Sequence, residues 1–158
     1  MTDISAAIIV AAPAERVWQL VAHHFAQVDA WATAVRSSHP LPERPIVPGA
    51  PVAGRVCRTG LPGLSQVTER IVAYDEATRT LTYEARLLPG LIPQARNQWE
   101  VVPIGDTHSR VSTHGSVQTQ GIPGMLLYLL LRPFLTLAGR RFLRDLRRHV
   151  DREMSRSG

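Results

Sequence analysis

Arg55 and Glu69 are the pair of residues in this sequence whose types and spacing could do chemistry inside a fold. Glu69 belongs to the alternating segment Ser65 to Tyr74, and Arg55 to the alternating segment Gly54 to Thr59. A hairpin that closes over residues 60–64 would set Arg55 opposite Glu69. An ion pair in apolar surroundings could orient the carbonyl or hydroxyl group of a ligand. The alternative is an Arg55 that points outward and pairs with nothing in particular.

Alternation along the other strands selects the side chains that would face the same interior. These positions are mostly apolar, with a few polar groups that could anchor a small hydrophobic molecule by one or two hydrogen bonds. The candidate ligand-binding residues are Trp31, Arg55, Cys57, Leu61, Pro62, Val67, Glu69, Ile71, Tyr83, Asn97, Trp99, Thr113, Leu135, Ala138 and Phe142. Further inward positions are Ala73, Ala85, Val101, Val111 and Val117. The alternative is that these side chains fill a solid core.

Apolar residues on loops would surround the mouth of such a cavity. They are Leu61, Pro62, Leu64, Leu91 and Ile92. Exposed apolar loop tips are costly unless they close on a ligand, on a partner or on each other. The sequence therefore predicts a mouth that can close.

A long C-terminal helix is the element around which the other segments are arranged. Residues Pro123 to Met154 follow the helical period, and Pro133 lies inside, where it should kink the helix or divide it into two pieces. The predicted buried stripe is Leu131, Leu135, Ala138, Phe142, Leu146, Val150 and Met154. The predicted polar face is Arg140, Arg141, Arg144, Asp145, Arg147, Arg148, Asp151 and Arg152. One side of the helix is therefore expected to be buried and the other wet.

The segments before this helix read as strands and two short helices. The predicted strands are Ile4–Ala11, Thr33–Ser38, Gly54–Thr59, Ser65–Tyr74, Thr80–Leu88, Arg96–Val102 and Ser109–Gln118. The short helices follow the first strand, one around Val17 and Leu20 and one carrying Phe25, Val28 and Trp31. This order predicts an α+β fold, in which a curved antiparallel sheet of about seven strands surrounds the long helix.

Length and composition are those of one globular domain, residues 1–158, with 44% apolar and 20% charged residues. The net charge of +5 comes from a chain whose eighteen basic residues are all Arg. Eight of them lie from Arg132 onward, where they fit the solvated face of the helix, so no nucleic-acid partner is expected. Cys57 is the only cysteine, which excludes an intrachain disulfide.

The sequence predicts a cytoplasmic protein with no transmembrane segment. No basic stretch followed by an apolar stretch begins at Met1. The apolar run Met125 to Leu131 has seven residues before Arg132, too few to span a bilayer even if extended to Ala138. This run packs under the kink at Pro133, or it meets a second subunit or a membrane surface. A homodimer is therefore one expectation for this chain.

No motif for a metal or a cofactor occurs. The six histidines show no metal-ligand spacing with a cysteine or a second histidine. The sequence contains no nucleophile elbow, phosphate loop or Gly-rich dinucleotide turn. We therefore expect neither a metal nor a cofactor.

Nearly the whole chain resembles the START-like superfamily, also called SRPBCC, which has the helix-grip fold. The resemblance rests on Ile8 to Val21 (IIVAAPAERVWQLV), on Gly54 to Ala85 and on the long helix. The chain is most similar to the bacterial polyketide cyclase/dehydrase-like group. Thr68-Glu69-Arg70-Ile71 followed by Tyr74-Asp75 is similar to the conserved Glu-Arg-Leu and Asp pattern of that group.

The chain is also distantly similar to the plant abscisic acid receptors. Gly60-Leu61-Pro62 resembles their gate loop. Their latch loop contains His-Arg-Leu, whereas the corresponding stretch here is Leu88-Pro89-Gly90-Leu91. Their pocket lysine has no counterpart, because this chain contains no Lys. An abscisic acid receptor is therefore not expected.

The resemblance implies an internal cavity that binds a small hydrophobic molecule, whether lipid-like, aromatic or polyketide-like. It also implies an alternative, a polyketide aromatase/cyclase or dehydratase that uses the same cavity. In that case Glu69 and Tyr83 are the candidates for general acid and base, and Arg55 would stabilise a developing enolate oxygen.

Overall fold

The computed structural model describes residues 2–158, and Met1, where the predicted domain begins, lies outside them. Within these residues the elements are β1 (Thr2–Val10), α1 (Ala14–Trp18), the π-helix η1 (Gln19–His23), the 3₁₀-helix η2 (Phe25–Ala30), β2 (Val35–Pro40), β3 (Gly54–Thr59), β4 (Gln66–Asp75), β5 (Thr80–Leu88), β6 (Ile92–Ile104), β7 (His108–Gln118) and α2 (Gly121–Arg156). The seven strands of residues 2–158 form one antiparallel sheet in the order β1-β7-β6-β5-β4-β3-β2. The predicted α+β helix-grip fold is confirmed.

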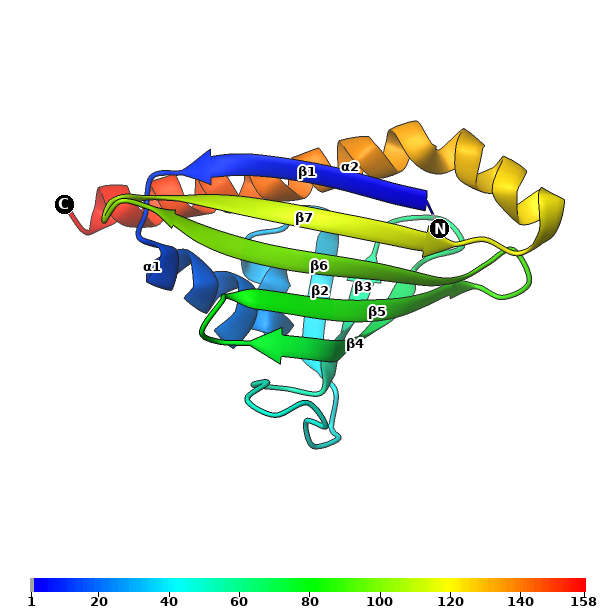
Figure 1. The fold of residues 1–158 in the computed structure, drawn as a ribbon, viewed down its shortest axis with the longest axis horizontal. Helices are drawn as coiled ribbons and strands as arrows, with labels where there is room; N and C mark the ends of the chain where they lie inside the picture. The colour runs from blue at the N-terminus through cyan, green and yellow to red at the C-terminus, as the bar shows by residue number, and fades with distance from the viewer. Residues whose placement is uncertain (1) are drawn as a thin grey trace.

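The sheet is strongly curved, and two register shifts contribute to its curvature. In Figure 1, β2 and β3 run across the direction of β5, β6 and β7, so the sheet wraps around its concave side. The pairing shifts between Val35 and Ser37 in β2 and between Ile71 and Ala73 in β4. Such bulges bend a strand and increase its twist.

The shift in β4 corrects one predicted position. Strict alternation from Ile71 placed Ala73 on the inner face, but Ala73 is exposed. After the bulge the inward position passes to Tyr74, whose ring lies 5.5 Å from that of Trp18. An extra residue in one strand reverses the alternation that follows it.

Strand β6 extends beyond its predicted bounds at both ends. Ile92 therefore lies in this strand and not in a loop. Ile92 pairs with Leu88 across the hairpin, and Ile104 pairs with His108. Ile92 is buried and clusters with Val117 and Tyr128. The prediction that Ile92 surrounds the cavity mouth is therefore wrong, because the residue belongs to a strand that α2 covers.

Helix α2 is one continuous helix with Pro133 inside it, so the chain is bent there rather than divided (Figure 1). Its two ends are buried in different clusters. Leu143, Leu146 and Val150 join the main core, whereas Tyr128 joins the second cluster. Between them the helix spans the concave face of the sheet without being fully buried.

The burial of three α2 residues differs from the prediction. Ala138 and Met154 are exposed. Asp145 is buried, because its carboxylate accepts hydrogen bonds from the backbone N–H of Thr33 at 3.0 Å and from the Thr33 hydroxyl at 2.7 Å. The η2–β2 connection thus supplies donors that make burial of this carboxylate tolerable.

Part of α2 is long and apolar enough to cross a membrane, judged by length and composition alone. It contains an 18-residue stretch, of which 11% is buried. This stretch is longer than the predicted apolar run Met125 to Leu131 and than its extension to Ala138. The same helix packs on β1 and contributes to the core, so the fold uses it as its covering helix.

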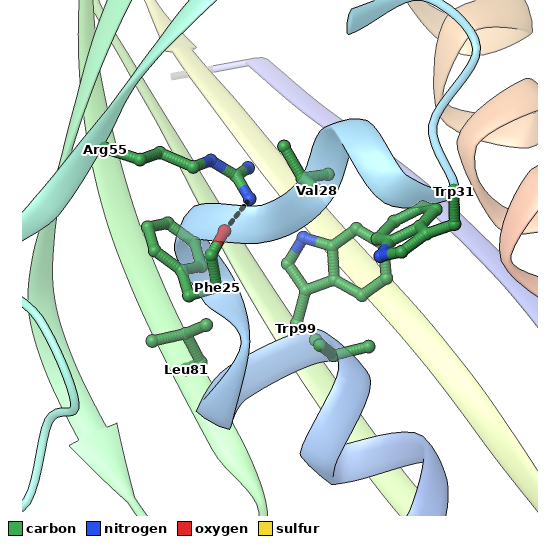
Figure 2. A pocket seen from close by; sticks show the side chains of 7 residues that line it. Phe25, Val28, Trp31, Arg55, Leu81 and Trp99 are labelled. Carbon is green, nitrogen blue, oxygen red and sulfur yellow. Dashed lines mark hydrogen bonds between the residues drawn. The ribbon is translucent and has the colours of Figure 1, made fainter. Parts of the chain in front are cut away.

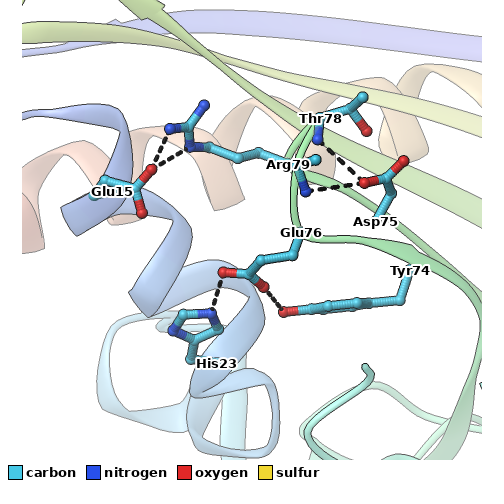
Figure 3. Close-up of polar contacts among 8 residues, drawn as sticks. Glu15, His23, Tyr74, Asp75, Glu76, Thr78 and Arg79 are labelled. Atoms are coloured by element: carbon cyan, nitrogen blue, oxygen red, sulfur yellow. Dashed lines mark hydrogen bonds and ion pairs between the residues drawn. The ribbon is translucent and has the colours of Figure 1, made fainter. Parts of the chain in front are cut away.

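Polar contacts attach the first helices to the β4–β5 turn (Figure 3). Glu76 accepts a hydrogen bond from the Tyr74 hydroxyl and lies 2.8 Å from His23 Nε2. Arg79 forms an ion pair with Glu15. His23 and Glu76 are about half exposed. These contacts therefore join two surface elements on the outside of the molecule.

Candidate functional site

The predicted pairing of Arg55 with Glu69 is confirmed. The register of β3 and β4 sets Arg55 opposite Glu69 and Cys57 opposite Val67. Arg55 Nε donates to Glu69 Oε2, and the two side chains are 6% and 15% exposed. Gly54 permits this approach, since a Cβ there would clash with the carbonyl oxygen of Glu69. The alternative of an outward Arg55 is excluded.

The guanidinium of Arg55 is held in place by three further contacts. Its Nη1 donates to the carbonyl oxygen of Phe25 at 2.8 Å (Figure 2). Its central carbon lies 4.0 Å from the ring centre of Phe25 and 5.3 Å from that of Tyr83. Burial alone would lower the pKa of Arg55, but the charge and hydrogen bond of Glu69, together with Tyr83 and Cys57, outweigh it and the pKa is raised. Arg55 therefore stays charged and rigid.

Tyr83 and Asn97 continue the polar cluster on the neighbouring strands. The Tyr83 hydroxyl accepts a hydrogen bond from Asn97 Nδ2 at 3.0 Å. Burial, followed by the negative charge of Glu69, raises the pKa of the Tyr83 phenol. Tyr83 is therefore neutral and can donate its hydroxyl proton to a carbonyl oxygen.

An inner cavity of about 260 Å³ lies between this cluster and α2. Its lining residues are Val35, Arg55, Cys57, Thr59, Val67, Glu69, Tyr83, Ala85, Leu87, Ala95, Arg96, Asn97 and Phe142. Polar groups gather on β3 to β6, whereas Phe142 of α2 supplies an aromatic wall. The predicted candidates Arg55, Cys57, Val67, Glu69, Tyr83, Asn97 and Phe142 are thus brought together.

An outer groove of about 850 Å³ adjoins the inner cavity, and Phe142 lines both. The groove contains the predicted residues Leu61, Pro62, Leu135 and Ala138. Its other lining residues are Thr33, Ala34, Arg36, Gly60, Leu64, Leu131, Phe134, Leu137 and Arg141. The β3–β4 loop and the middle of α2 therefore form opposite sides of the mouth.

Two predicted cavity residues, Trp31 and Trp99, lie in the packed layer beneath the cavity instead. They line a hollow of about 10 Å³, room for one water molecule (Figure 2). The ring of Trp31 meets those of Trp99 and Phe142 edge to face, each at 6.1 Å. Trp31 therefore supports the cavity wall by packing against Phe142, and Trp99 packs against Trp31.

Ile71 and Thr113 are buried, but they do not line the cavity or the groove. Ile71 packs in the main core. Both were selected by strand parity, which identifies the inner face but not which inner residues the helix covers.

The second predicted mouth loop is bound to α2 rather than poised over the groove. The carbonyl oxygen of Leu91 accepts a hydrogen bond from the backbone N–H of Gln120 at 2.9 Å. A Cβ on Gly124 would clash with the same oxygen. The β5–β6 loop therefore seats the start of α2, and the mouth is formed by the β3–β4 loop.

The cavity also contains residues that the sequence reasoning did not select, among them Leu87, Ala95 and Arg96. Ala95 has the same parity as Asn97 but precedes the predicted start of β6. Extending the alternation backward from Asn97 would have found it. Among residues 2–158, no three His, Cys, Asp or Glu side chains converge where they could hold a metal ion.

Comparison with known proteins agrees with this fold. A family model described as polyketide cyclase / dehydrase and lipid transport matches residues 1–151. An aromatase/cyclase from a Streptomyces species has a similar structure, with a TM-score of 0.74, 14% identity and coverage of 97% of this chain and 96% of that chain. No curated protein matches the chain in sequence.

Two further solved structures show the same fold. A START superfamily protein from Mycobacterium smegmatis has a TM-score of 0.72 and 16% identity, with coverage of 95% of this chain and 97% of that chain. A norcoclaurine synthase from Thalictrum flavum has a TM-score of 0.72 and 14% identity, with coverage of 97% and 96%.

Proposed function

The chain belongs to the polyketide cyclase / dehydrase and lipid transport family, and we propose that its inner cavity binds one small, neutral, hydrophobic molecule that carries a carbonyl or hydroxyl group. The observation that supports this proposal is a cavity with apolar walls and one polar cluster. Such a combination is typical of sites that bury a ligand and fix its orientation by a few hydrogen bonds.

The charges of the cluster favour a neutral ligand. Arg55 and Glu69 neutralise each other through their ion pair. A ligand carboxylate would meet Glu69, and a ligand ammonium would meet Arg55, in both cases away from bulk water. Tyr83 and Asn97 instead offer hydrogen bonds to an uncharged oxygen.

The volume limits the size of what the inner cavity alone can hold. Its 260 Å³ is slightly below the range of roughly 300–1,000 Å³ that is usual for ligand pockets. A ligand of one or two rings fits this volume. A longer ligand would pass Phe142 and extend into the outer groove.

Native mass spectrometry of the freshly purified protein tests this proposal. We expect a co-purified small molecule in the wild type and its loss in Ala85→Leu, which fills the cavity. Ala73→Leu, on the exposed face of β4, is the matched control and should retain the molecule. Equal occupancy in Ala85→Leu and wild type would place the ligand outside the cavity.

A second candidate is a cyclase, because Glu69, Tyr83 and the Arg55 guanidinium share one cavity. Glu69 would remove a proton next to a carbonyl, and Arg55 would stabilise the enolate oxygen. The enolate carbon would attack a second carbonyl of the same chain, whose oxygen would take the Tyr83 proton. Binding is favoured, since Arg55 already donates to Glu69 and to Phe25.

Turnover of a verified substrate separates the two candidates. A cyclase of this kind loses most of its kcat in Glu69→Gln and in Tyr83→Phe, while the substrate still binds. Unchanged turnover in both variants would contradict these catalytic roles.

A further inference from the structure

The first half of α2 presents large apolar side chains to solvent. Six residues form this outer apolar face, and each is more than half exposed: Ile122, Leu126, Leu129, Leu130, Phe134 and Leu137. Only one side of this half is buried, through Tyr128, which is 1% exposed. An apolar surface of this kind on a helix indicates a docking site.

The same face of the helix becomes basic in its second half. Leu126, Leu130 and Leu137 are followed at helical spacing by Arg140, Arg144 and Arg148. Residues 121–144 contain no Asp or Glu. The first acidic residue is Asp145, which is buried against Thr33. The face therefore carries an apolar patch next to a patch of arginines.

A hollow joins the two patches. It has a volume of about 460 Å³ and is lined by Leu137, Arg140, Arg141, Arg144 and Arg148, together with Thr33 and Asp145. Several guanidinium groups around one space match the geometry of a phosphate group. Phosphate beside hydrocarbon is the chemistry of a phospholipid surface.

We propose that this face of α2 docks on the surface of an anionic phospholipid bilayer. The outer apolar face enters the boundary between headgroups and acyl chains, and Arg140, Arg144 and Arg148 contact the phosphates. The helix lies on the membrane and does not span it, because Leu146 and Val150 remain in the core of the fold.

A second copy of this chain fits the face less well. The second copy would bring another apolar patch. Its residues 121–144 contain no carboxylate that could pair with the arginines of the first copy. The chain also carries a net charge of +5, so two copies repel each other. Anionic lipid supplies both the hydrocarbon and the negative charge.

Docking would place the mouth of the outer groove against the bilayer. Phe134 and Leu137 belong both to the outer apolar face and to the groove lining. Leu61, on the opposite side of the mouth, is 59% exposed. An apolar molecule could then pass between membrane and groove without crossing water. Docking itself does not depend on what the cavity binds.

Vesicle flotation tests the proposal with full-length protein. The probes are vesicles of phosphatidylcholine alone and of equal parts phosphatidylcholine and phosphatidylglycerol. We expect binding to the anionic vesicles that weakens with added salt. Leu126→Glu/Leu130→Glu should weaken it at least about tenfold, and Arg140→Gln/Arg144→Gln should weaken it roughly tenfold and reduce its salt dependence.

The matched control is Ile9→Glu/Ile46→Glu, two exposed apolar residues that do not belong to α2. It should bind like the wild type, as should Ala85→Leu, which tests the cavity separately. Absence of binding to anionic vesicles, or binding unchanged in Leu126→Glu/Leu130→Glu, overturns the proposal. A dimer that this double variant converts to monomer, without vesicle binding, assigns the face to a second copy and overturns it as well.

Discussion

Arg55 and Glu69 stabilise the fold only as a pair. Each is largely removed from water, so the charge of either would be costly without the other. Gly54 sets the spacing of the two backbones, and the carbonyl oxygen of Phe25 takes a further guanidinium hydrogen. The pair therefore gives the cavity a fixed polar end with no net charge.

Glu69→Gln should lower the free energy of unfolding by about 3 kcal/mol, because it leaves the buried Arg55 charge without its counter-ion. Urea unfolding measures this change. Glu43→Gln is the matched control, since Glu43 pairs with Arg70 on the surface and both are about half exposed. No measurable change is expected there. Equal effects of the two substitutions would show that the inner pair is not desolvated.

Cys57 and Tyr83 should make the protein sensitive to alkaline pH. Burial raises the pKa of the Cys57 thiol from 9.0 and that of the Tyr83 phenol from 10.0. The unfolded chain loses these protons near the ordinary values, whereas the folded chain retains them. The stability is therefore fully present below about pH 9 and falls as pH rises, by at most about 1.4 kcal/mol per pH unit for each group.

Urea unfolding at a series of alkaline pH values measures this dependence. Few other side chains titrate in this range, because the chain contains no Lys. Cys57→Ala/Tyr83→Phe should show a flatter decline than the wild type. The same slope in both proteins would mean that neither group is buried in its neutral form.

Strand alternation predicted which of these residues meet. The alternation of side chains along the two strands, together with the short loop between them, was enough to set Arg55 opposite Glu69. A hairpin with a short loop has few possible registers. Ala73 and Asp145 were placed on the wrong side. A bulge in β4 reversed the alternation at Ala73, and donors from the distant residue Thr33 made burial of Asp145 possible. The first cause depends on how β4 pairs with β5, and the second on a residue 112 positions away in the sequence.

Helix α2 is held at two separated points, and this attachment leaves its middle half-buried. At its start, Gly124 lies close to the carbonyl oxygen of Leu91 and Tyr128 is buried next to Ile92. At its end, Leu146 and Val150 pack in the main core. The section between them forms one wall of the cavity and the groove.

Two glycines of α2 should respond in opposite directions to the same substitution. Gly124→Ala should lower stability by about 1–3 kcal/mol, because the added methyl group meets the Leu91 backbone. Gly139→Ala should raise stability by about 0.5–1 kcal/mol, because a Cβ there would meet no atom within 4 Å apart from its own stretch of helix. Urea unfolding compares them. A gain in both variants would show that the start of α2 is not seated on the β5–β6 loop.

The elements were predictable where the sequence pattern is long and periodic. Strands β3 and β5 have their predicted bounds, and α2 was recognised over most of its length. Strand β6 was predicted too short because Pro93 and Pro103 suggested its ends. Its hydrogen bonds to β5 and β7 continue past both prolines, which only the assembled sheet could show.

At the scale of the whole molecule, the hollow depends on how far α2 stands from the curved sheet. Alternation indicates which side chains face that space, but the distance is set by the bulges of the sheet and by the two attachment points of α2. The cavity was therefore predictable in composition and not in volume. A single domain over residues 1–158 and a cytoplasmic location stay predictions.

The most direct test of the central claim is a titration of ¹⁵N-labelled protein with 2-naphthol, a neutral bicyclic phenol, followed by amide chemical shifts. We predict saturable shifts at the backbone amides of Tyr83, Asn97 and Phe142, with none at the exposed Ala73. Saturable shifts confined to the outer face, or no saturable shift at the cavity residues, would contradict a ligand site between the sheet and α2.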